Sequence, residues 1–282
     1  MASFSKFVRP EQPTSRSISD LDLKIMEVVL RFRFSPASQI WRLVGGNEDV
    51  THRRLRRPWE RRLINRFAFP FPRSHSEFYY YLDNRSPLTL LSERRGLDIR
   101  DEMLEEIRNN RERDYANAAL RGQEMQLGFL RHSLMISRMH SCVEVACKKS
   151  GGRVQLETWR QGGPLAGRKV EVPKVKSSRD GHQFSWEESG ETERLPVELD
   201  GLFSLRFFDR AKETQLVHFF YEADRGSMNS TAMLKKLRAY YYLVKRQQRH
   251  KELFGIHPIR ASLLRQHMRA APDGSCRWYN IR

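Results

Sequence analysis

The chain has little cysteine and no long hydrophobic run. Its three cysteines, Cys142, Cys147 and Cys276, have neither the spacing of a zinc site nor that of a disulfide framework, so we expect free thiols in a reducing compartment. No run of about 18 apolar residues is present, which excludes a membrane-spanning helix. Residues 1–6 lack the apolar core of a signal peptide. These absences favour a cytoplasmic protein.

A glycine-rich nucleotide-binding loop is also missing. Gly162 and Gly163 precede Pro164 and lack the strand before and the helix after that such loops need. No internal repeat is visible, so the common repeat architectures are excluded as well.

Acidic residues are outnumbered by basic ones. The sequence has 51 Lys and Arg against 34 Asp and Glu, a net charge of +17. A surplus of this size attracts polyanions, and nucleic acid fits best. Neither end of the chain carries a basic amphipathic helix, so we expect no membrane partner. An apolar content of 39% over 282 residues supports a packed core and two domains of ordinary size.

The first part of the chain predicts three helices and a two-stranded ribbon. Residues 1–19 lack periodicity and are expected to form a flexible basic arm. Apolar residues then recur at helical spacing, with Asp20 as the N-cap of the first helix and Ser35-Pro36 as the cap and first turn of the second. The three expected helices cover residues 20–30, 35–43 and 47–63, and the two extended pieces cover residues 65–71 and 77–82. This order is typical of a winged helix-turn-helix, predicted over residues 20–84.

The third of these helices is rich in arginine. Between Arg31 and Arg73 the sequence has eleven arginines and three acids, a net charge of +8. A helix that is only solvated would carry lysine and glutamate, whereas arginine with few acids favours contacts with phosphate or guanine. Pro58 is expected to kink or shorten the helix. The candidate DNA-binding residues are His52, Arg53, Arg54, Arg56, Arg57, Arg61, Arg62, Arg66 and Arg73.

The second half of the chain predicts an α/β domain. A helical connector is expected over residues 85–114 and the domain itself over residues 115–265, followed by a C-terminal tail over residues 266–282. Helical periodicity up to residue 147 is followed by an alternating strand at 153–159. Residues 161–194 are rich in Gly, Lys, Ser and Glu, which predicts an irregular excursion or a hairpin.

Three carboxylates stand at the ends of two predicted strands. The apolar run from Leu216 to Tyr221 predicts a buried strand, and Glu222 and Asp224 follow it on one face because strand side chains alternate. Asp200 begins the preceding strand. A helix capped near Asn229 then brings Lys235 and Lys236. Such a set of oxygen ligands could hold a divalent cation, with Asp200, Glu222 and Asp224 as the candidate metal ligands.

The order of these motifs resembles the replication-relaxation family of plasmids and other mobile elements. The resemblance rests on His132 after a leucine, Asp200-Gly201, Glu222-x-Asp224-Arg225-Gly226 and the helix from Lys236 to Tyr240, and it covers roughly residues 20–264. It implies a winged helix followed by a mixed-sheet domain similar to the PD-(D/E)xK nuclease fold, in an α+β or α/β architecture. The strand lysine of that nuclease pattern is absent, because Asp224 occupies its place, so Arg225, Lys235 or Lys236 would have to supply the cation.

Three functional hypotheses follow. In the first, the protein binds double-stranded DNA in plasmid replication, relaxation or its control, and a degenerate second domain pairs its acids with Arg225, Arg206 or a helix terminus. In the second, the protein is a metal-dependent endonuclease or nickase with Mg²⁺ or Mn²⁺ on the three carboxylates, while His132, Lys235 or Lys236 positions the water or the leaving oxygen. In the third it is a transcription repressor. We expect the first, with no required cofactor, and a homodimer and replication or mobilisation proteins as candidate partners.

Overall fold

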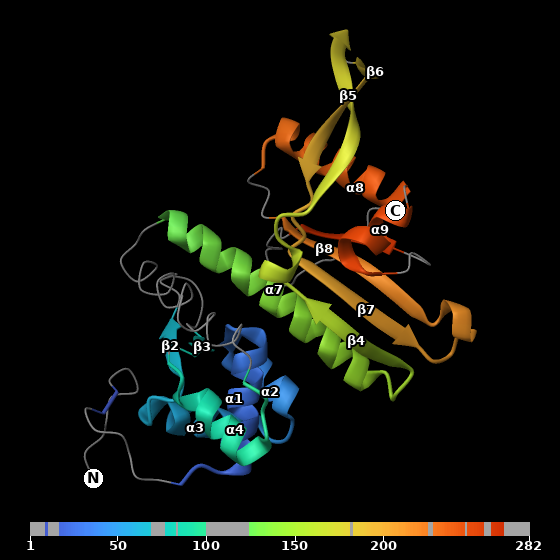
Figure 1. The fold of residues 1–282 in the computed structure, drawn as a ribbon. Helices are drawn as coiled ribbons and strands as arrows, with labels where there is room; N and C mark the ends of the chain where they lie inside the picture. The colour runs from blue at the N-terminus through green and yellow to red at the C-terminus, as the bar shows by residue number, and fades with distance from the viewer. Residues whose placement is uncertain are drawn as a thin grey trace. The chain divides into compact units, whose positions relative to one another are not determined.

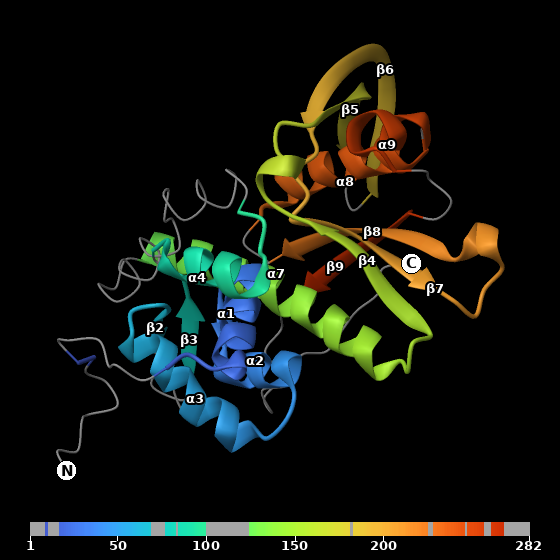
Figure 2. The same cartoon turned by 60° about the horizontal axis from the view of Figure 1, so that its bottom comes forward.

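The computed structural model describes residues 9–10, 17–68, 77–82, 84–99, 124–180, 183–224, 228–245, 247–256 and 261–267. The chain divides into two compact units, residues 1–146 and residues 147–282, and each is described by itself (Figures 1 and 2). Both units combine helices with small sheets that are mainly antiparallel, which confirms a mixed α and β fold. No described helix is both long and apolar enough to cross a bilayer. The domain bounds expected from the sequence stay predictions.

The first unit joins helices to a three-stranded antiparallel sheet. The strands lie in the order β1-β3-β2, so β3 pairs with both neighbours. The elements are α1 (Asp20–Phe32), β1 (Ser35–Pro36), α2 (Ala37–Val44), α3 (Glu48–Glu60), β2 (Asn65–Ala68), β3 (Phe78–Tyr81), α4 (Ser86–Arg95) and α7 (Glu124–Lys149), whose residues up to Ala146 belong to this unit. The predicted helices and the ribbon are present in the described part of the chain; expected segments at residues 69–76, 100–107 and 115–123 lie outside it.

Two local predictions at helix starts were wrong. Ser35 and Pro36 do not open α2 but pair with Tyr80 and Tyr79 as the short strand β1, a position where proline's missing N–H is tolerated. Ser19, not Asp20, caps α1: the Asp22 N–H donates to Ser19 Oγ, while the Ser19 N–H donates to Asp22 Oδ2 at 2.9 Å. This reciprocal pair is a capping box with Asp at its third position, which a search for Ser/Thr followed by Glu/Gln overlooks.

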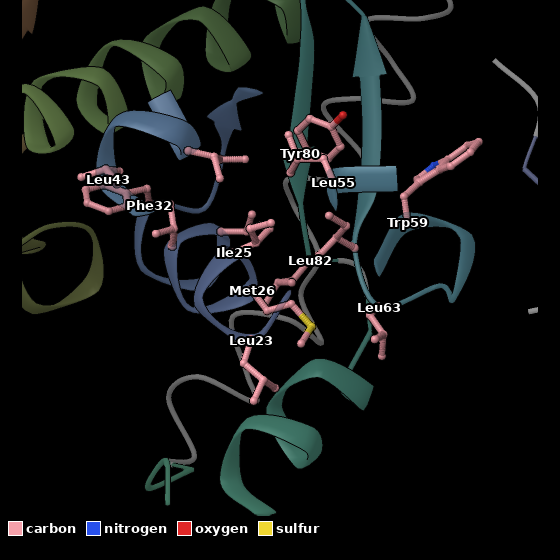
Figure 3. Packing of buried hydrophobic residues seen from close by; sticks show 14 of the residues in the cluster. Leu23, Ile25, Met26, Phe32, Leu43, Leu55, Trp59, Leu63, Tyr80 and Leu82 are labelled. Atoms are coloured by element: carbon pink, nitrogen blue, oxygen red, sulfur yellow. The ribbon is translucent and has the colours of Figure 1, made fainter. Parts of the chain in front are cut away.

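The core of the first unit lies between α1, α2, α3 and the sheet. Figure 3 shows Ile25 and Met26 of α1 converging with Leu55 of α3 and Tyr80 of β3, and each of these side chains is at most 4% exposed. Pro58 shortens α3 as expected, because the helix ends at Glu60 and the Pro58 carbonyl accepts from the N–H of Leu63 instead.

Helix α7 packs on the first unit through its N-terminal and middle turns. Leu130 is fully buried in a cluster with Phe34, Phe67 and Tyr81. Further along the helix, Arg31 Nη1 lies 2.8 Å from Glu144 Oε1. Apolar packing and an ion pair therefore hold α7 against the strands and α1.

The second unit contains a mixed four-stranded sheet. The strand order is β4-β7-β8-β9, antiparallel except for the parallel pair β8 and β9. The elements are β4 (Val154–Arg160), η1 (Gly163–Leu165), β5 (Lys169–Asp180), β6 (Gln183–Pro196), β7 (Gly201–Phe207), η2 (Lys212–Thr214), β8 (Leu216–Asp224), α8 (Ser230–Lys245), α9 (Gln247–Phe254) and β9 (Ala261–His267). The mixed sheet agrees with the sequence prediction. For residues 161–194 the sequence predicted either an irregular excursion or a hairpin. The structure shows the hairpin, because β5 and β6 pair along their length.

Helix α8 covers one face of this sheet together with the base of the hairpin. Leu202 and Phe220, a cross-strand pair of β7 and β8, pack with Ala239 and Leu243 of α8 and with apolar residues of β5 and β6. Figures 1 and 2 show the β5–β6 hairpin extending past α8. On the other face Phe203 stacks between Trp159 and Phe219.

Arg238 joins α8 to the hairpin. Its side chain is buried, with Nη1 3.0 Å from Glu193 Oε1 of β6 and Nη2 donating to the Pro173 carbonyl of β5. Burying a guanidinium without such partners costs free energy. These two contacts of Arg238 therefore fix where the hairpin leaves the core.

We expect Arg238→Met to lower the free energy of unfolding by about 2–4 kcal/mol, because Glu193 and the Pro173 carbonyl lose their donor. The measurement is urea unfolding followed by circular dichroism. Arg249→Met is the matched control, since Arg249 pairs with Glu252 at 3.7 Å on the surface and should change stability by less than about 1 kcal/mol. Equal losses in the two variants would contradict a structural role for Arg238.

Candidate functional site

The first candidate site lies where β7 begins and β8 ends, since these antiparallel strands bring Asp200 next to Glu222. Gly201 pairs with Tyr221, so Asp200 stands one residue before the ladder, next to Glu222. Asp200 Oδ2 accepts from the Ala223 N–H at 2.7 Å. A Cβ on Gly201 would lie 3.3 Å from Tyr221 Cδ1 and 3.4 Å from Trp159 Cζ2, so glycine allows the close approach that positions Asp200.

Glu222 is buried and paired with a lysine from α8. Its side chain is 6% exposed, and Oε2 contacts Lys236 Nζ. The Glu222 carboxyl also forms a side-chain hydrogen bond with Asp200. Asn229 caps α8 by accepting from the Ala232 N–H at 2.8 Å, which sets where the helix begins and so where Lys236 stands.

The environment of Glu222 favours its neutral form. The pKa of Glu222 is raised from 4.5 to about 9, because burial and, second, the Asp200 carboxyl raise it by more than Lys236 lowers it. Even with Lys236 beside it, a carboxyl with this pKa holds a proton at neutral pH. The protonation of Glu222 therefore depends on both of its neighbours, the Asp200 carboxyl and the Lys236 ammonium group.

The structure brings together three of the residues predicted to act here: Asp200, Glu222 and Lys236. Lys235 is exposed on α8, and Asp224 ends β8 with its side chain outside the description. His132 lies on α7 in the first unit, so its role beside the acids stays a prediction. Within the described residues no three His, Cys, Asp or Glu side chains form a metal-binding group.

One predicted partner of the acids was wrong. Arg206 does not pair with Glu222 but with Glu157 of β4, because it stands at the opposite end of β7. Arg225 lies outside the described residues. Lys236, named among the alternatives, is the cation that contacts Glu222.

A polar chain further along the same strands was missed by the sequence analysis. Ser204 Oγ lies 2.7 Å from His218 Nδ1 and accepts from Thr158 Oγ1 at 3.1 Å. His218 precedes Glu222 by four residues on the same strand, so the two share a face, and this spacing was the available signal. The pairing with Ser204 depends on strand register, which the sequence did not give.

The second candidate site is the outer surface of α3. His52, Arg53 and Arg62 are exposed, and Arg54, Arg56, Arg57 and Arg61 are partly exposed, while Thr51, Leu55 and Trp59 are buried on the inner side. Helix α3 therefore presents a basic face on the side opposite to its apolar face. Arg73 lies outside the described residues.

Several of these arginines already have partners within the unit. Arg54 lies 3.7 Å from Asp22 Oδ2, and Arg56 pairs with Glu60 one helical turn on. Arg66 stacks on Trp59, with Cζ 3.5 Å from the ring centroid, and also lies over Phe78. Burial lowers the pKa of Arg66 below its ordinary value, against the opposing effect of Tyr80. Arg66 therefore holds the base of the β2–β3 ribbon together.

The two units and their sites define a basic two-unit protein of mixed α and β structure, with a carboxylate–lysine cluster in its second unit. A family model described as replication-relaxation matches residues 26–257. The chain belongs to the replication-relaxation family, which confirms the resemblance found in its sequence. The searches of curated proteins and of solved structures gave no match.

Glu222→Gln tests the proton balance of the acid pair. Since the folded pKa is raised, the folded protein keeps a proton between about pH 4.5 and 9 that the unfolded chain releases, so stability falls as pH rises through this window. We expect the variant to lose this part of the pH dependence and to gain thermal stability relative to wild type as pH rises. The measurement is thermal unfolding at about pH 5, 7 and 9.

Glu198→Gln, at an exposed position three residues before β7, is the control and should follow the wild-type pH profile. Parallel profiles for wild type and Glu222→Gln would mean that Glu222 titrates alike in the folded and unfolded states.

Proposed function

We propose that the protein binds double-stranded DNA through a winged helix-turn-helix in its first unit, with α3 as the recognition helix. The element order α1-β1-α2-α3-β2-β3 and the sheet order β1-β3-β2 support this proposal, since three helices and a ribbon are the parts of that motif. The N-cap Asn47 accepts from the Val50 N–H at 3.1 Å and so defines the start of α3.

The observation that carries the proposal is the uncompensated charge on the outer face of α3. Among the described residues no carboxylate lies within ion-pair distance of Arg53 or Arg57. Arginines on a rigid helix that are outside ion pairs attract the phosphates of a duplex and can enter its major groove.

Membership of the replication-relaxation family points to a role in the replication of plasmids or other mobile elements. We infer that DNA binding serves that role, in replication, relaxation or its control. The second unit is then a nuclease-like domain that no longer cleaves. The Lys236–Glu222 contact supports this view, because it places an ammonium group on an oxygen that a metal ion would need.

A metal-dependent endonuclease or nickase is the second candidate function. It is favoured by the buried carboxyl of Glu222, which lies beside a second carboxyl on Asp200. These two oxygen donors suit Mg²⁺ or Mn²⁺, with Asp224 as a third donor, and such an ion would lower the pKa of a bound water. Lys236 would then stabilise negative charge on the phosphate.

Arg53→Ala and Arg57→Ala test the recognition helix. We expect each to weaken specific binding to duplex DNA by about 1–3 kcal/mol, because each removes a charged donor from the outer face of α3. The measurement is fluorescence anisotropy with a labelled duplex at fixed salt. Lys24→Ala removes one charge from the exposed side of α1 in the same unit and should have little effect. Equal affinity for wild type and both arginine variants would contradict α3 as the recognition helix.

A supercoiled plasmid distinguishes the two functions of the second unit. We expect purified protein to shift the plasmid on an agarose gel to the same extent with EDTA, Mg²⁺ or Mn²⁺, and Glu222→Ala and Asp200→Asn to leave the shift unchanged. Nicking or linearisation that needs the metal and disappears in both variants, but not in the exposed control Asp209→Asn, would instead establish the endonuclease.

A further inference from the structure

The outer face of α3 contains one stripe that points directly away from the core. Consecutive helical residues are about 100° apart. Leu55 is fully buried and marks the inward direction. Val50, Arg53 and Arg57 then lie within about 40° of the opposite direction. They form a stripe at spacings of three and four residues, which we call the outer stripe.

The arginines beside the outer stripe are held by contacts within the protein. Arg54 Nη1 lies 3.5 Å from Ser19 Oγ and 3.7 Å from Asp22 Oδ2, at the N-terminus of α1. On the other side Arg56 is paired with Glu60. Side chains fixed in this way along the helix flanks can meet phosphates at the rims of a groove, but they do not extend toward its floor.

The outer stripe itself is not held in this way. Arg53 is exposed, and its one hydrogen bond in the described structure runs from Nε to the Asp49 carbonyl at 3.3 Å, which leaves both terminal nitrogens of the guanidinium for other acceptors. Arg57 is partly exposed, and no acid pairs with it among the described residues. Two terminal nitrogens on a fixed stem match the paired acceptors O6 and N7 of guanine.

Val50 adds an apolar member to the outer stripe. It is 36% exposed, in the first turn of a helix whose other apolar side chains are buried. A single exposed valine is ordinary on a protein surface. Here it continues a line of two arginines at the N-terminal end of the helix, the end that contacts base edges in helix-turn-helix proteins. An apolar side chain there can contact the methyl group of thymine.

We propose that Val50, Arg53 and Arg57 read base edges, with Val50 on a thymine methyl and the two arginines on guanines, while Arg54 and Arg56 contact phosphates. This assignment rests on the proposed function. Helical rise places Val50 and Arg57 about 10 Å apart along α3, which corresponds to about three base-pair steps. The preferred site therefore contains a thymine and guanines within about four base pairs.

The test begins with selection of duplexes from a randomised pool by the full-length wild-type protein, followed by affinity measurements on base analogues in the selected site. Replacing the thymine with deoxyuridine removes only the methyl group and should weaken wild-type binding about fourfold. Val50→Ala should bind both duplexes alike. Replacing a guanine with 7-deazaguanine removes the N7 acceptor. In Arg53→Ala or Arg57→Ala, the preference for guanine at the position that the replaced arginine contacts should fall by about 5- to 150-fold.

Arg56→Ala is the matched control for charge. It should weaken binding to all sequences alike and reduce the slope of log affinity against log salt concentration by about one, as expected for one lost phosphate contact. The thymine and guanine preferences should stay as in wild type. Circular dichroism checks that each variant is folded, which we expect of the outer-stripe variants because the stripe is not part of the core. Thermal unfolding of Arg56→Ala measures the loss of the Arg56–Glu60 pair separately from the loss of DNA affinity.

The outcomes separate this inference from the proposed function. A wild-type protein that binds no duplex would overturn both. A wild-type protein that binds without sequence preference, or outer-stripe variants that weaken all sequences uniformly and keep the wild-type responses to deoxyuridine and 7-deazaguanine, would overturn the inference and leave DNA binding in place.

Discussion

The cost of burying Glu222 is the constraint on which the second unit depends. A carboxyl at the end of an apolar strand requires a partner, and the structure supplies Lys236 from α8. The same helix buries Ala239 and Leu243 against the sheet and uses Arg238 to hold the hairpin. One helix therefore positions a charge, part of the core and an appended hairpin, so the acid pair and the architecture around it cannot be altered separately.

In the first unit, arginine serves two different purposes. Arg66, stacked on Trp59 and Phe78, and Arg54, beside Asp22, contribute to packing and to the approach of neighbouring elements. Arg53 and Arg57 do not have such contacts in the described structure. The distinction matters for mutagenesis, because loss of DNA affinity in an Arg66 variant would combine altered packing with altered charge, whereas the same loss in an Arg57 variant would report on charge alone.

Much of the fold was predictable because its determinants are local. Apolar periodicity gave the helices, the run before Glu222 gave β8, and Asn229 gave the start of α8. What failed or stayed open depended on residues far apart in sequence. Ser35-Pro36 is a strand because β3 pairs with it, and Arg206 pairs with Glu157 because of strand register. The choice of Lys236 among three candidate cations likewise required the packing of α8 on the sheet.

Gly201 has a consequence for how members of the family could diverge. Its hydrogen faces Tyr221 and Trp159 so closely that even a methyl group would displace one of them by a few tenths of an ångström. This requirement belongs to the aromatic face of the sheet and holds whether or not Asp200 takes part in any chemistry. A family member without the carboxylate would still need the glycine for this packing, so the glycine by itself does not indicate activity.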